Sequence, residues 1–586
     1  MNSLIKNSFS RYVALSQLCH AIIVLVFGTA GLFAVPSVGS AASQETFRLG
    51  ERIYREGILS SGDQLRTLAM GDVSIPGTSF ACVSCHLRSG LGSLSEGVYS
   101  PPVNGEKLFK PLQNNYKGYE QKTKYKLPSL RPAYTDESLM AAIRSGVDPA
   151  GRALSSVMPR YSLEKEDMSL LISYLKSLSV QVSPGVTDST LRFATIITDD
   201  VRQEERDAML ASFEYNFNVK NNQAKLFANN KSPRVNNTRL MVEKMLGPDS
   251  KDLATRNFSL SQWLLKGPPE TWRSQLEEYN RKEPVFAMLG GITNGEWKPI
   301  HQFSEENRIP CLFPNTDFPE NSGADWYTIY LSKGYYQEGE SAARYLNSKD
   351  DVLKGKPVVQ IIRDSREGRT LSAGFTKTRQ ELGQKAPVTL LLPAENTLDK
   401  ELLNQVLSNE KPAVLIIWDD SGALTALESL GDDIIKPEMI FVSSRYMGQN
   451  LWMLPEKLRD ITCITYPFAF SANAATASMG KQKVQEDLKK TLSQSDILLK
   501  DPAEKITSLT NSLNQLLNTA LIEMKGNYYR DNFLDVLGTM MNQQYPLYGQ
   551  ISIGPGQRYA SKGCYIVQLT KGDKPELIKI SDWEIQ

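Results

Sequence analysis

The sequence predicts a multidomain protein in which an all-α domain over residues 43–180 precedes a larger α/β domain over residues 191–586. Amphipathic helical patterns fill most of the first stretch. The second stretch alternates short apolar runs with helical patterns, which is typical of parallel sheets covered by helices on both faces. Residues 181–190 are polar, with one proline and one glycine, and predict a linker between the two domains.

The first 42 residues are expected to be a signal peptide. Lys6 and Arg11 give a positive start, an apolar run of 15 residues extends from Ala21 to Val35, and small residues lead to a cleavage site near Ala42. The apolar run is short for a membrane span, although retention as an uncleaved anchor is the alternative. We therefore expect an exported, periplasmic protein with no membrane span in the mature chain.

Composition limits the partners and the disulfides. The 66 basic and 65 acidic residues give a formal charge of +1, so we expect no nucleic acid partner and no attraction to anionic membranes. Outside the motif described next, the mature chain has Cys311, Cys463 and Cys564. In an oxidising compartment these three can form at most one disulfide, and the sequence does not say which.

The stretch CVSCH, which contains Cys82, Cys85 and His86, matches the attachment signature of c-type haem. Two thiols one helical turn apart can add to the two vinyl groups of one haem, and the next residue then places an imidazole beneath the iron. A redox cysteine pair and half of a zinc site are the alternatives. A zinc site would need further Cys or His nearby, and a redox pair would open a helix within a βαβ unit. Neither context is found, so we expect one covalently attached haem c.

A methionine is the expected second axial ligand, because the chain has only 3 histidines. Met158 lies in a predicted loop next to Pro159 and is the preferred candidate. Met168 lies on the apolar stripe of a predicted helix and is expected in the core. Met70 and Met140 are the remaining rivals.

Residues 43–180 resemble a monohaem cytochrome c domain of class I type. ETFRLGERIYREG resembles the family's N-terminal helix, in which Gly50 would allow a close approach of the C-terminal helix. YTDESLMAAIRSGVDPAGRAL resembles the penultimate helix, and Met158, Pro159 and Tyr161 match the MPxY pattern. The insert KPLQNNYKGYEQKTKYKLPSLRPA departs from the family. The resemblance implies electron transfer through a haem with His and Met ligands, and a periplasmic redox partner such as a dehydrogenase.

Residues 191–586 resemble a type I periplasmic solute-binding protein of the branched-chain amino acid binding kind, which has two lobes. FAMLGGITNGEWKPIHQFSEENRIPCLFPNTDFPE is the most specific stretch. GYYQEGESAARYL matches the segment that crosses to the second lobe, and YGQISIGPGQRYASKGCYIVQL resembles the terminal hairpin. The resemblance implies a ligand between the lobes, at the carboxyl ends of the strands.

The ligand-binding residues that this resemblance implies are Thr293, Asn294, Asn315, Thr316, Trp418 and Arg445. Arg445 stands where the family has a glutamate that binds the ligand's amine. A guanidinium would instead suit a carboxylate, so a small acidic solute is expected rather than a neutral amino acid. A plain surface charge is the alternative for Arg445. His301 is expected to be structural rather than a second haem ligand.

Three functions fit these expectations. The first is a cytochrome whose fused domain binds a ligand or docks a partner. The alternative is a solute receptor for an ABC-type importer with an accessory haem, and the third is a docking module without a small ligand. We expect no enzyme, because the sequence has no nucleophile elbow, phosphate loop or metal cluster, although carboxylate or cysteine chemistry stays open.

Overall fold

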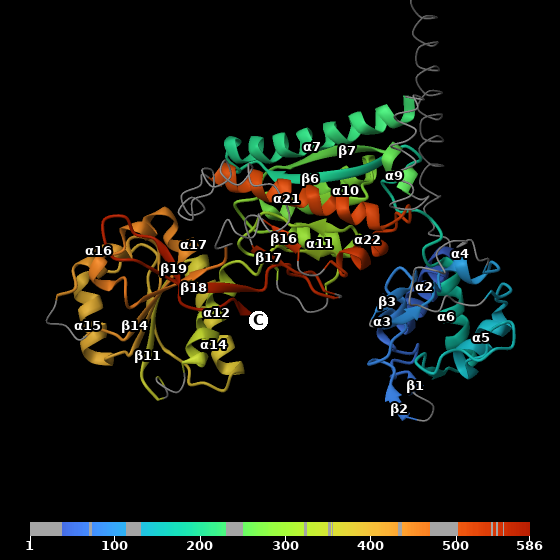
Figure 1. Cartoon of the computed structure of the whole chain (residues 1–586), viewed down its shortest axis with the longest axis horizontal. Coiled ribbons are helices and arrows are strands. Elements are labelled where there is room, and N and C mark those ends of the chain that lie inside the picture. The colour runs from blue at the N-terminus through green and yellow to red at the C-terminus, as the bar shows by residue number, and fades with distance from the viewer. Residues whose placement is uncertain are drawn as a thin grey trace, which may run out of the picture. The chain divides into compact units, whose positions relative to one another are not determined.

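The computed structural model describes residues 38–69, 73–95, 97–112, 130–229, 250–320, 325–349, 353, 355–431, 436–468, 502–540, 543–545, 549–554 and 556–585. Most of the expected signal peptide, and residues 113–129 of the insert, lie outside these ranges. Contacts divide the chain into two compact units, residues 1–181 and 182–586 (Figure 1).

The N-terminal unit is mainly helical, with α2 (Val38–Glu56), α3 (Val83–His86), α4 (Gly105–Leu108), α5 (Asp136–Ser145) and α6 (Lys165–Ser177). It also contains an antiparallel sheet in the order β2 (Val73–Pro76), β1 (Arg66–Ala69), β5 (Arg160–Ser162), and a hairpin of β3 (Ser93–Ser95) and β4 (Val98–Ser100). The prediction of an all-α domain is therefore wrong. These strands are only three or four residues long, too short for a period-two pattern to stand out in the sequence.

Helices α2 and α6 cross closely at Gly50, as the sequence predicted. A Cβ atom at Gly50 would lie 2.4 Å from the carbonyl oxygen of Leu170 and 2.7 Å from Cβ of Tyr174. Ile53 and Met168 are fully buried in the core of the same unit. The crossing therefore requires a residue without a side chain at this position.

Most of the expected linker belongs to the second unit. The amide of Ser183 donates to the carbonyl of Tyr528 at 3.3 Å, and the amide of Arg530 donates to Oγ of Ser183 at 2.9 Å. The amide of Arg192 donates to the carbonyl of Gly185 at 2.8 Å. These bonds anchor the backbone to the second unit from Ser183 onward. Most of residues 181–190 is therefore not a free linker, contrary to the interpretation from the sequence.

The first lobe of the second unit is built on a five-stranded parallel sheet in the order β10 (Thr328–Ile329), β9 (Cys311–Leu312), β8 (Ala287–Leu289), β6 (Thr190–Thr198), β7 (Asn257–Leu265). Its helices are α7 (Gln203–Asn229), α9 (Ser250–Thr255), α10 (Trp272–Lys282), α11 (Lys298–Glu306), α21 (Pro502–Glu523) and α22 (Arg530–Leu537). The predicted apolar runs became β6 and β8. Strand β7 was not predicted, because its polar residues interrupt the apolar run.

The second lobe has an eight-stranded mixed sheet. Its parallel part runs in the order β12 (Val388–Leu392), β11 (Val358–Arg363), β13 (Val414–Trp418), β14 (Met439–Ser443), β15 (Thr462–Tyr466). The antiparallel part is β18 (Gly563–Leu569), β19 (Leu577–Lys579) and β20 (Glu584–Ile585). The helices are α12 (Tyr335–Ser348), α14 (Arg366–Glu381), α15 (Lys400–Glu410), α16 (Ala423–Glu428) and α17 (Ser444–Met447). The prediction of two lobes is confirmed, whereas the second sheet is not purely parallel.

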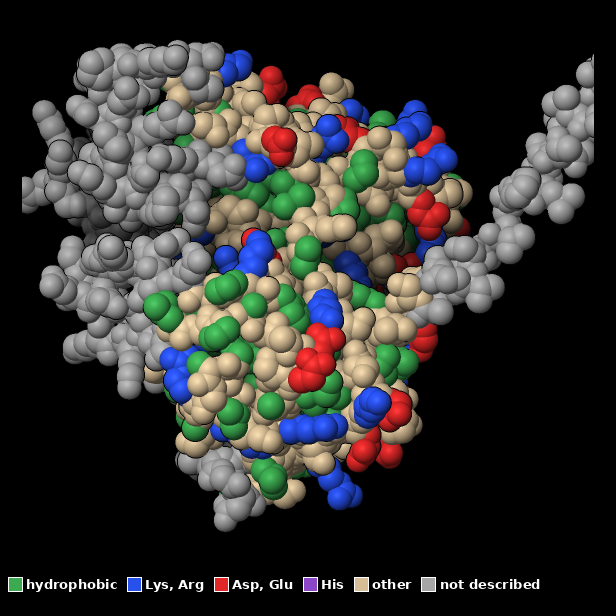
Figure 2. Space-filling model, turned by 90° about the vertical axis from the view of Figure 1, so that its right-hand side faces the viewer, with side chains coloured by type: hydrophobic (Ala, Val, Ile, Leu, Met, Phe, Trp, Pro, Cys, Tyr) green, Lys and Arg blue, Asp and Glu red, His purple; other side chains and the backbone are tan. Residues whose placement is uncertain are grey.

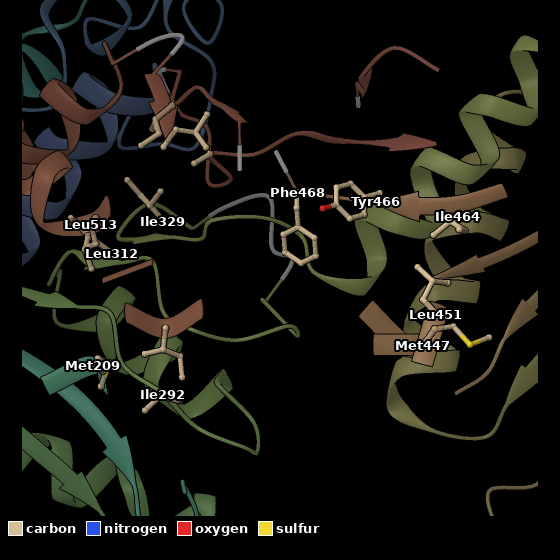
Figure 3. Packing of buried hydrophobic residues seen from close by; sticks show 14 of the residues in the cluster. Met209, Ile292, Leu312, Ile329, Met447, Leu451, Ile464, Tyr466, Phe468 and Leu513 are labelled. Carbon is tan, nitrogen blue, oxygen red and sulfur yellow. The ribbon is translucent and has the colours of Figure 1, made fainter. Parts of the chain in front are cut away.

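The chain crosses between the lobes at several points. The expected terminal hairpin is one of them: β17 (Gly549–Ile551) pairs with β16 (Gln543–Tyr545), while β18 joins the sheet of the second lobe. Phe468 follows β15 and lies between the apolar groups of the two lobes (Figure 3). Residues of both lobes share one apolar cluster, so the hydrophobic core continues through the crossing.

Positive and negative side chains are intermixed on the face shown in Figure 2, in line with the formal charge of +1. Among the described residues, no helix is both long and apolar enough to span a bilayer.

Replacing Gly50 by Ala is expected to destabilise the N-terminal unit by roughly 1–3 kcal/mol, because the added methyl group overpacks the helix crossing. Hydrogen exchange followed by mass spectrometry on peptides from α6 would detect this as faster exchange. Glu56→Ala at the exposed end of α2 is the control and should leave exchange unchanged. Equal protection in Gly50→Ala and the wild type would contradict the close crossing.

Candidate functional site

The four predicted haem residues lie around one cavity of the N-terminal unit. The cavity has about 1240 Å³ of empty space, including its open mouth, and Cys82, Cys85, His86 and Met158 all line it. The remaining walls are largely apolar, with Tyr54, Leu139, Ile143, Leu171 and Leu175 among them. The fold therefore brings Met158 to the same space as the CVSCH motif.

His86 is held in one orientation by its backbone neighbours. Its amide donates to the carbonyl of Cys82 at 2.9 Å, and its ring Nδ1 lies 2.8 Å from the carbonyl oxygen of Pro101. A carbonyl only accepts, so Nδ1 carries the proton and Nε2 keeps the lone pair that can bind iron. Burial lowers the pKa of the ring, which favours this neutral form.

Met158 sits in a loop that the small sheet fixes. The amide of Met158 donates to the carbonyl of Ser155 at 3.2 Å, and the guanidinium of Arg160 donates to the carbonyl of Met158 at 2.5 Å. Next along β5, the hydroxyl of Tyr161 donates to the carbonyl of Phe80 at 2.9 Å. Strand β5, which the sequence did not predict, thus sets the position of the loop.

The rival methionines lie elsewhere. Met168 is fully buried in the helical core, Met140 packs against that core, and neither lines the cavity. Met70 is outside the described residues. Two thiols, an imidazole of fixed tautomer and a thioether around one apolar cavity fit a haem c with His86 and Met158 as axial ligands. Within the described ranges, no group of three or more His, Cys, Asp or Glu is placed to hold a metal ion.

Four of the six predicted solute residues share a second cavity, in the second unit. Thr293, Asn294, Asn315 and Thr316 line about 900 Å³ of empty space. They follow β8 and β9, and a parallel bridge between Ile292 and Asn315 extends that pairing to the cavity wall. The cavity thus lies at the carboxyl ends of parallel strands, where α/β folds place their ligands.

Turns hold these polar side chains in place. The amide of Gly295 donates to Oγ1 of Thr293 at 3.0 Å, and the amide of Phe318 donates to Oγ1 of Thr316 at 3.1 Å. Asn294 uses its side-chain amide to donate to the carbonyl of Asp200 at 2.6 Å. The two threonine hydroxyls accept in these turns, so each still has a proton to donate to a ligand.

Trp418 does not reach this cavity. Its side chain has no exposed surface, and it packs edge-on against Phe375 in the core of the second lobe, with ring centroids 6.3 Å apart. Trp418 is the last residue of β13, and its side chain points into the sheet packing rather than toward the loops. The prediction that it contacts a ligand is therefore corrected.

Arg445 is neither a surface charge nor an unoccupied anion site. Its side chain, in α17, is 9% exposed and forms an ion pair with Asp317 of the first lobe. Its Nε lies 3.2 Å from Oε1 of Glu338, and a second guanidinium nitrogen donates to Oγ of Ser332 at 3.3 Å. The guanidinium also lies 5.5 Å from the ring centroid of Phe468. Asp317 already pairs with Arg445 and the carboxyl of Glu338 lies beside it, so the expectation that Arg445 binds an acidic solute is not supported.

Glu338, the buried partner of Arg445, lies in α12 and has no exposed surface. Its Oε2 accepts hydrogen bonds from the hydroxyls of Ser443 at 2.8 Å and Thr465 at 2.7 Å. Burial raises the pKa of Glu338 to about 7, although Arg445 and both hydroxyls oppose this rise. The carboxyl therefore titrates near neutral pH, at the crossing between the lobes.

Lys505 is a lining residue that the sequence analysis missed. It lies in the first turn of α21, is half-buried, and lines the second cavity beside Ile506. Its Nζ lies 5.9 Å from the ring centroid of Phe468. Burial and, next, the charge of Arg445 lower its pKa. No local motif marks Lys505, because only folding brings it near Thr293 and Thr316.

His301 and the remaining cysteines are structural. The ring Nε2 of His301 lies 2.8 Å from Oδ2 of Asp325, and its Nδ1 lies 2.9 Å from the hydroxyl of Tyr330. Both ring nitrogens therefore have partners within the fold. Cys311, Cys463 and Cys564 are each buried and unpaired.

Comparison with known proteins gives matches among solved structures only. No protein-family model and no curated protein sequence matches the chain. A putative branched-chain amino acid ABC transporter from Rhodospirillum rubrum is 12% identical, with a TM-score of 0.44, and the match covers 67% of this chain and 100% of that one.

Two other matches are solute-binding structures with ligands. A branched-chain amino acid ABC transporter from Thermus thermophilus with bound valine is 11% identical, with a TM-score of 0.43 over 68% of this chain and 97% of that one. An ABC transporter solute-binding protein from R. palustris in complex with 4-hydroxybenzoate is 15% identical, with a TM-score of 0.42, and the match covers 68% of this chain and 98% of that one. At these scores, none of the likenesses determines a function for this chain.

The buried carboxyl of Glu338 predicts a pH dependence of stability. The unfolded chain releases this proton near the ordinary pKa of 4.5, whereas the folded chain holds it until about 7. The folded state therefore binds more protons in this interval, and the free energy of unfolding falls by about 3 kcal/mol as the pH rises through it. Glu338→Gln should remove this part of the decrease.

Urea unfolding followed by tryptophan fluorescence checks the prediction, because all 7 tryptophans lie in the second unit. Glu410→Gln, an exposed change at the end of α15, is the control and should keep the wild-type pH profile. A Glu338→Gln variant with the same pH profile as the wild type would show that Glu338 titrates normally.

Proposed function

We propose that the chain is an exported receptor for a small solute, of the kind that serves an ABC-type importer, with one covalently attached haem c in its N-terminal unit. The observation that supports the receptor role is the cavity of about 900 Å³ at the carboxyl ends of β8 and β9, beside the crossing between the lobes. Its volume, which includes the open mouth, is in the range of small-molecule sites, and most of its lining side chains are polar or charged, so they can form hydrogen bonds to a polar solute.

Closure of the two lobes is the step that would retain the solute. Thr293, Asn315 and Thr316 come from the first lobe, while Asp317 beside them is ion-paired with Arg445 of the second. A solute bound against this loop therefore lies next to a contact that joins the lobes. Hinge closure around a ligand is a common response of two-lobed folds with such crossings.

A second function, electron carriage, is favoured by the cavity of the N-terminal unit. Cys82 and Cys85 would hold the haem by thioethers, and His86 and Met158 would supply the axial ligands. A haem with both axial positions filled by the protein transfers electrons rather than binding a substrate. The partner we propose is a periplasmic dehydrogenase or another redox protein.

Binding of a small solute by the full-length chain is the first test of the receptor role. Calorimetry with a panel that includes L-valine, benzoate and 4-hydroxybenzoate should find at least one ligand. Thr293→Ala should lower the affinity for that ligand by about ten-fold, because the substitution removes a hydroxyl that faces the cavity. Thr519→Ala, on the exposed face of α21, should bind as the wild type does. Unchanged binding by Thr293→Ala would place the ligand elsewhere.

Haem attachment is tested on protein from a host with a cytochrome c maturation system. The intact mass should exceed that of the polypeptide by one haem, and Cys82→Ala/Cys85→Ala should lack the addition because no thioether can form. Met158→Leu should keep the covalent haem but lose the visible band of sulfur-to-iron charge transfer. Met140→Leu is the matched control, since Met140 does not line the cavity. A wild-type mass without haem would refute the assignment.

A further inference from the structure

Three charged side chains line the solute cavity: Glu205, Asp317 and Lys505. Each of the two acids has an arginine partner, because Glu205 forms an ion pair with Arg202 and Asp317 forms one with Arg445. The negative charges of the lining are therefore already compensated within the protein.

Lys505 differs from these acids. Within the described residues, no carboxylate lies within ion-pair distance of its Nζ. Its Nζ lies 5.9 Å from the ring centroid of Phe468, and the guanidinium of Arg445 lies 5.5 Å from the same ring. The charge of Asp317 acts on Lys505 in the opposite sense to that of Arg445, without forming an ion pair with it. A cation–π contact compensates a half-buried ammonium only weakly, and a second cation nearby adds repulsion. Among the described residues, Lys505 is thus the charged side chain of the lining that has no ion pair.

The other polar side chains of the lining can donate hydrogen bonds. The hydroxyls of Thr293 and Thr316 each keep a proton after their turn contacts, and Asn315 has a side-chain amide. A carboxylate only accepts hydrogen bonds, so it matches a lining of one ammonium and several neutral donors.

We propose that Lys505 selects the solute, and that the solute is a small monocarboxylate rather than an amino acid. This inference rests on the solute-binding role proposed above and names its ligand class. An amino acid would bring an ammonium group as well, and that group would need an unpaired carboxylate. Glu205 and Asp317, the acids of the described lining, are both held by arginines. The sequence predicted that Arg445 binds the carboxylate of the solute; in this proposal Lys505, at the start of α21, binds it instead.

The test compares matched ligands on the full-length chain. Calorimetry would measure isovalerate against isovaleramide, benzoate against benzamide, and isovalerate against L-valine. The wild type should prefer a carboxylate over its amide, and isovalerate over valine, by about ten-fold or more. Lys505→Gln should abolish the preference for the carboxylate, and Lys505→Arg should keep most of it.

Glu504→Gln is the matched control, because Glu504 is an exposed neighbour on the same helix and its change also shifts the net charge by one. It should preserve the preference. An unaltered urea midpoint of tryptophan fluorescence in Lys505→Gln shows that the variant folds.

The outcomes separate the two proposals. If no compound of the panel binds, both the receptor role and this inference are refuted. If compounds bind but amides bind as well as acids, or valine binds better than isovalerate, the receptor role stands and the inference on Lys505 fails. If Lys505→Gln still prefers the carboxylate over its amide, the inference on Lys505 is also wrong.

Discussion

The crossing between the two lobes depends on the guanidinium of Arg445. It joins Asp317 of the first lobe to the buried Glu338 of α12, and it lies over the ring of Phe468. Of its two carboxylate partners Glu338 has no exposed surface whereas Asp317 is about half exposed, so removing the guanidinium would leave the ionised form of Glu338 without a positive partner in an apolar setting. The hydroxyls of Ser443 and Thr465 also stabilise the ionised form of Glu338. The network therefore fixes where the lobes meet.

This network also decides the charge of the solute cavity. Arg445 and Asp317 compensate each other's charge within the fold. The charged residue of the described lining that has no ion pair is Lys505, which belongs to a helix far along the chain. One ion pair at the crossing thus has two effects: it joins the lobes, and it compensates the charge of Asp317 in the cavity lining.

Local sequence was sufficient where chemistry depends on spacing. The CVSCH motif contains its own geometry, since two thiols and an imidazole lie within one helical turn, and the structure places Cys82, Cys85 and His86 around one cavity. Met158 was predicted as an axial ligand from its loop position, and the structure shows that it lines the same cavity. Continuous apolar runs similarly predicted β6 and β8 of the first lobe and the parallel strands of the second lobe, because a buried parallel strand is apolar on both faces.

The sequence by itself thus determined the order of the two units, the CVSCH motif and the loops of Thr293 and Thr316. Only the tertiary structure decided the roles of charged and aromatic residues, because their partners are distant in the chain. Trp418 is in the core rather than the cavity, Arg445 is held by carboxylates from two other segments, and Lys505 reaches the cavity from the last third of the chain. A side chain's type is local information, whereas its burial and the charges around it follow from packing.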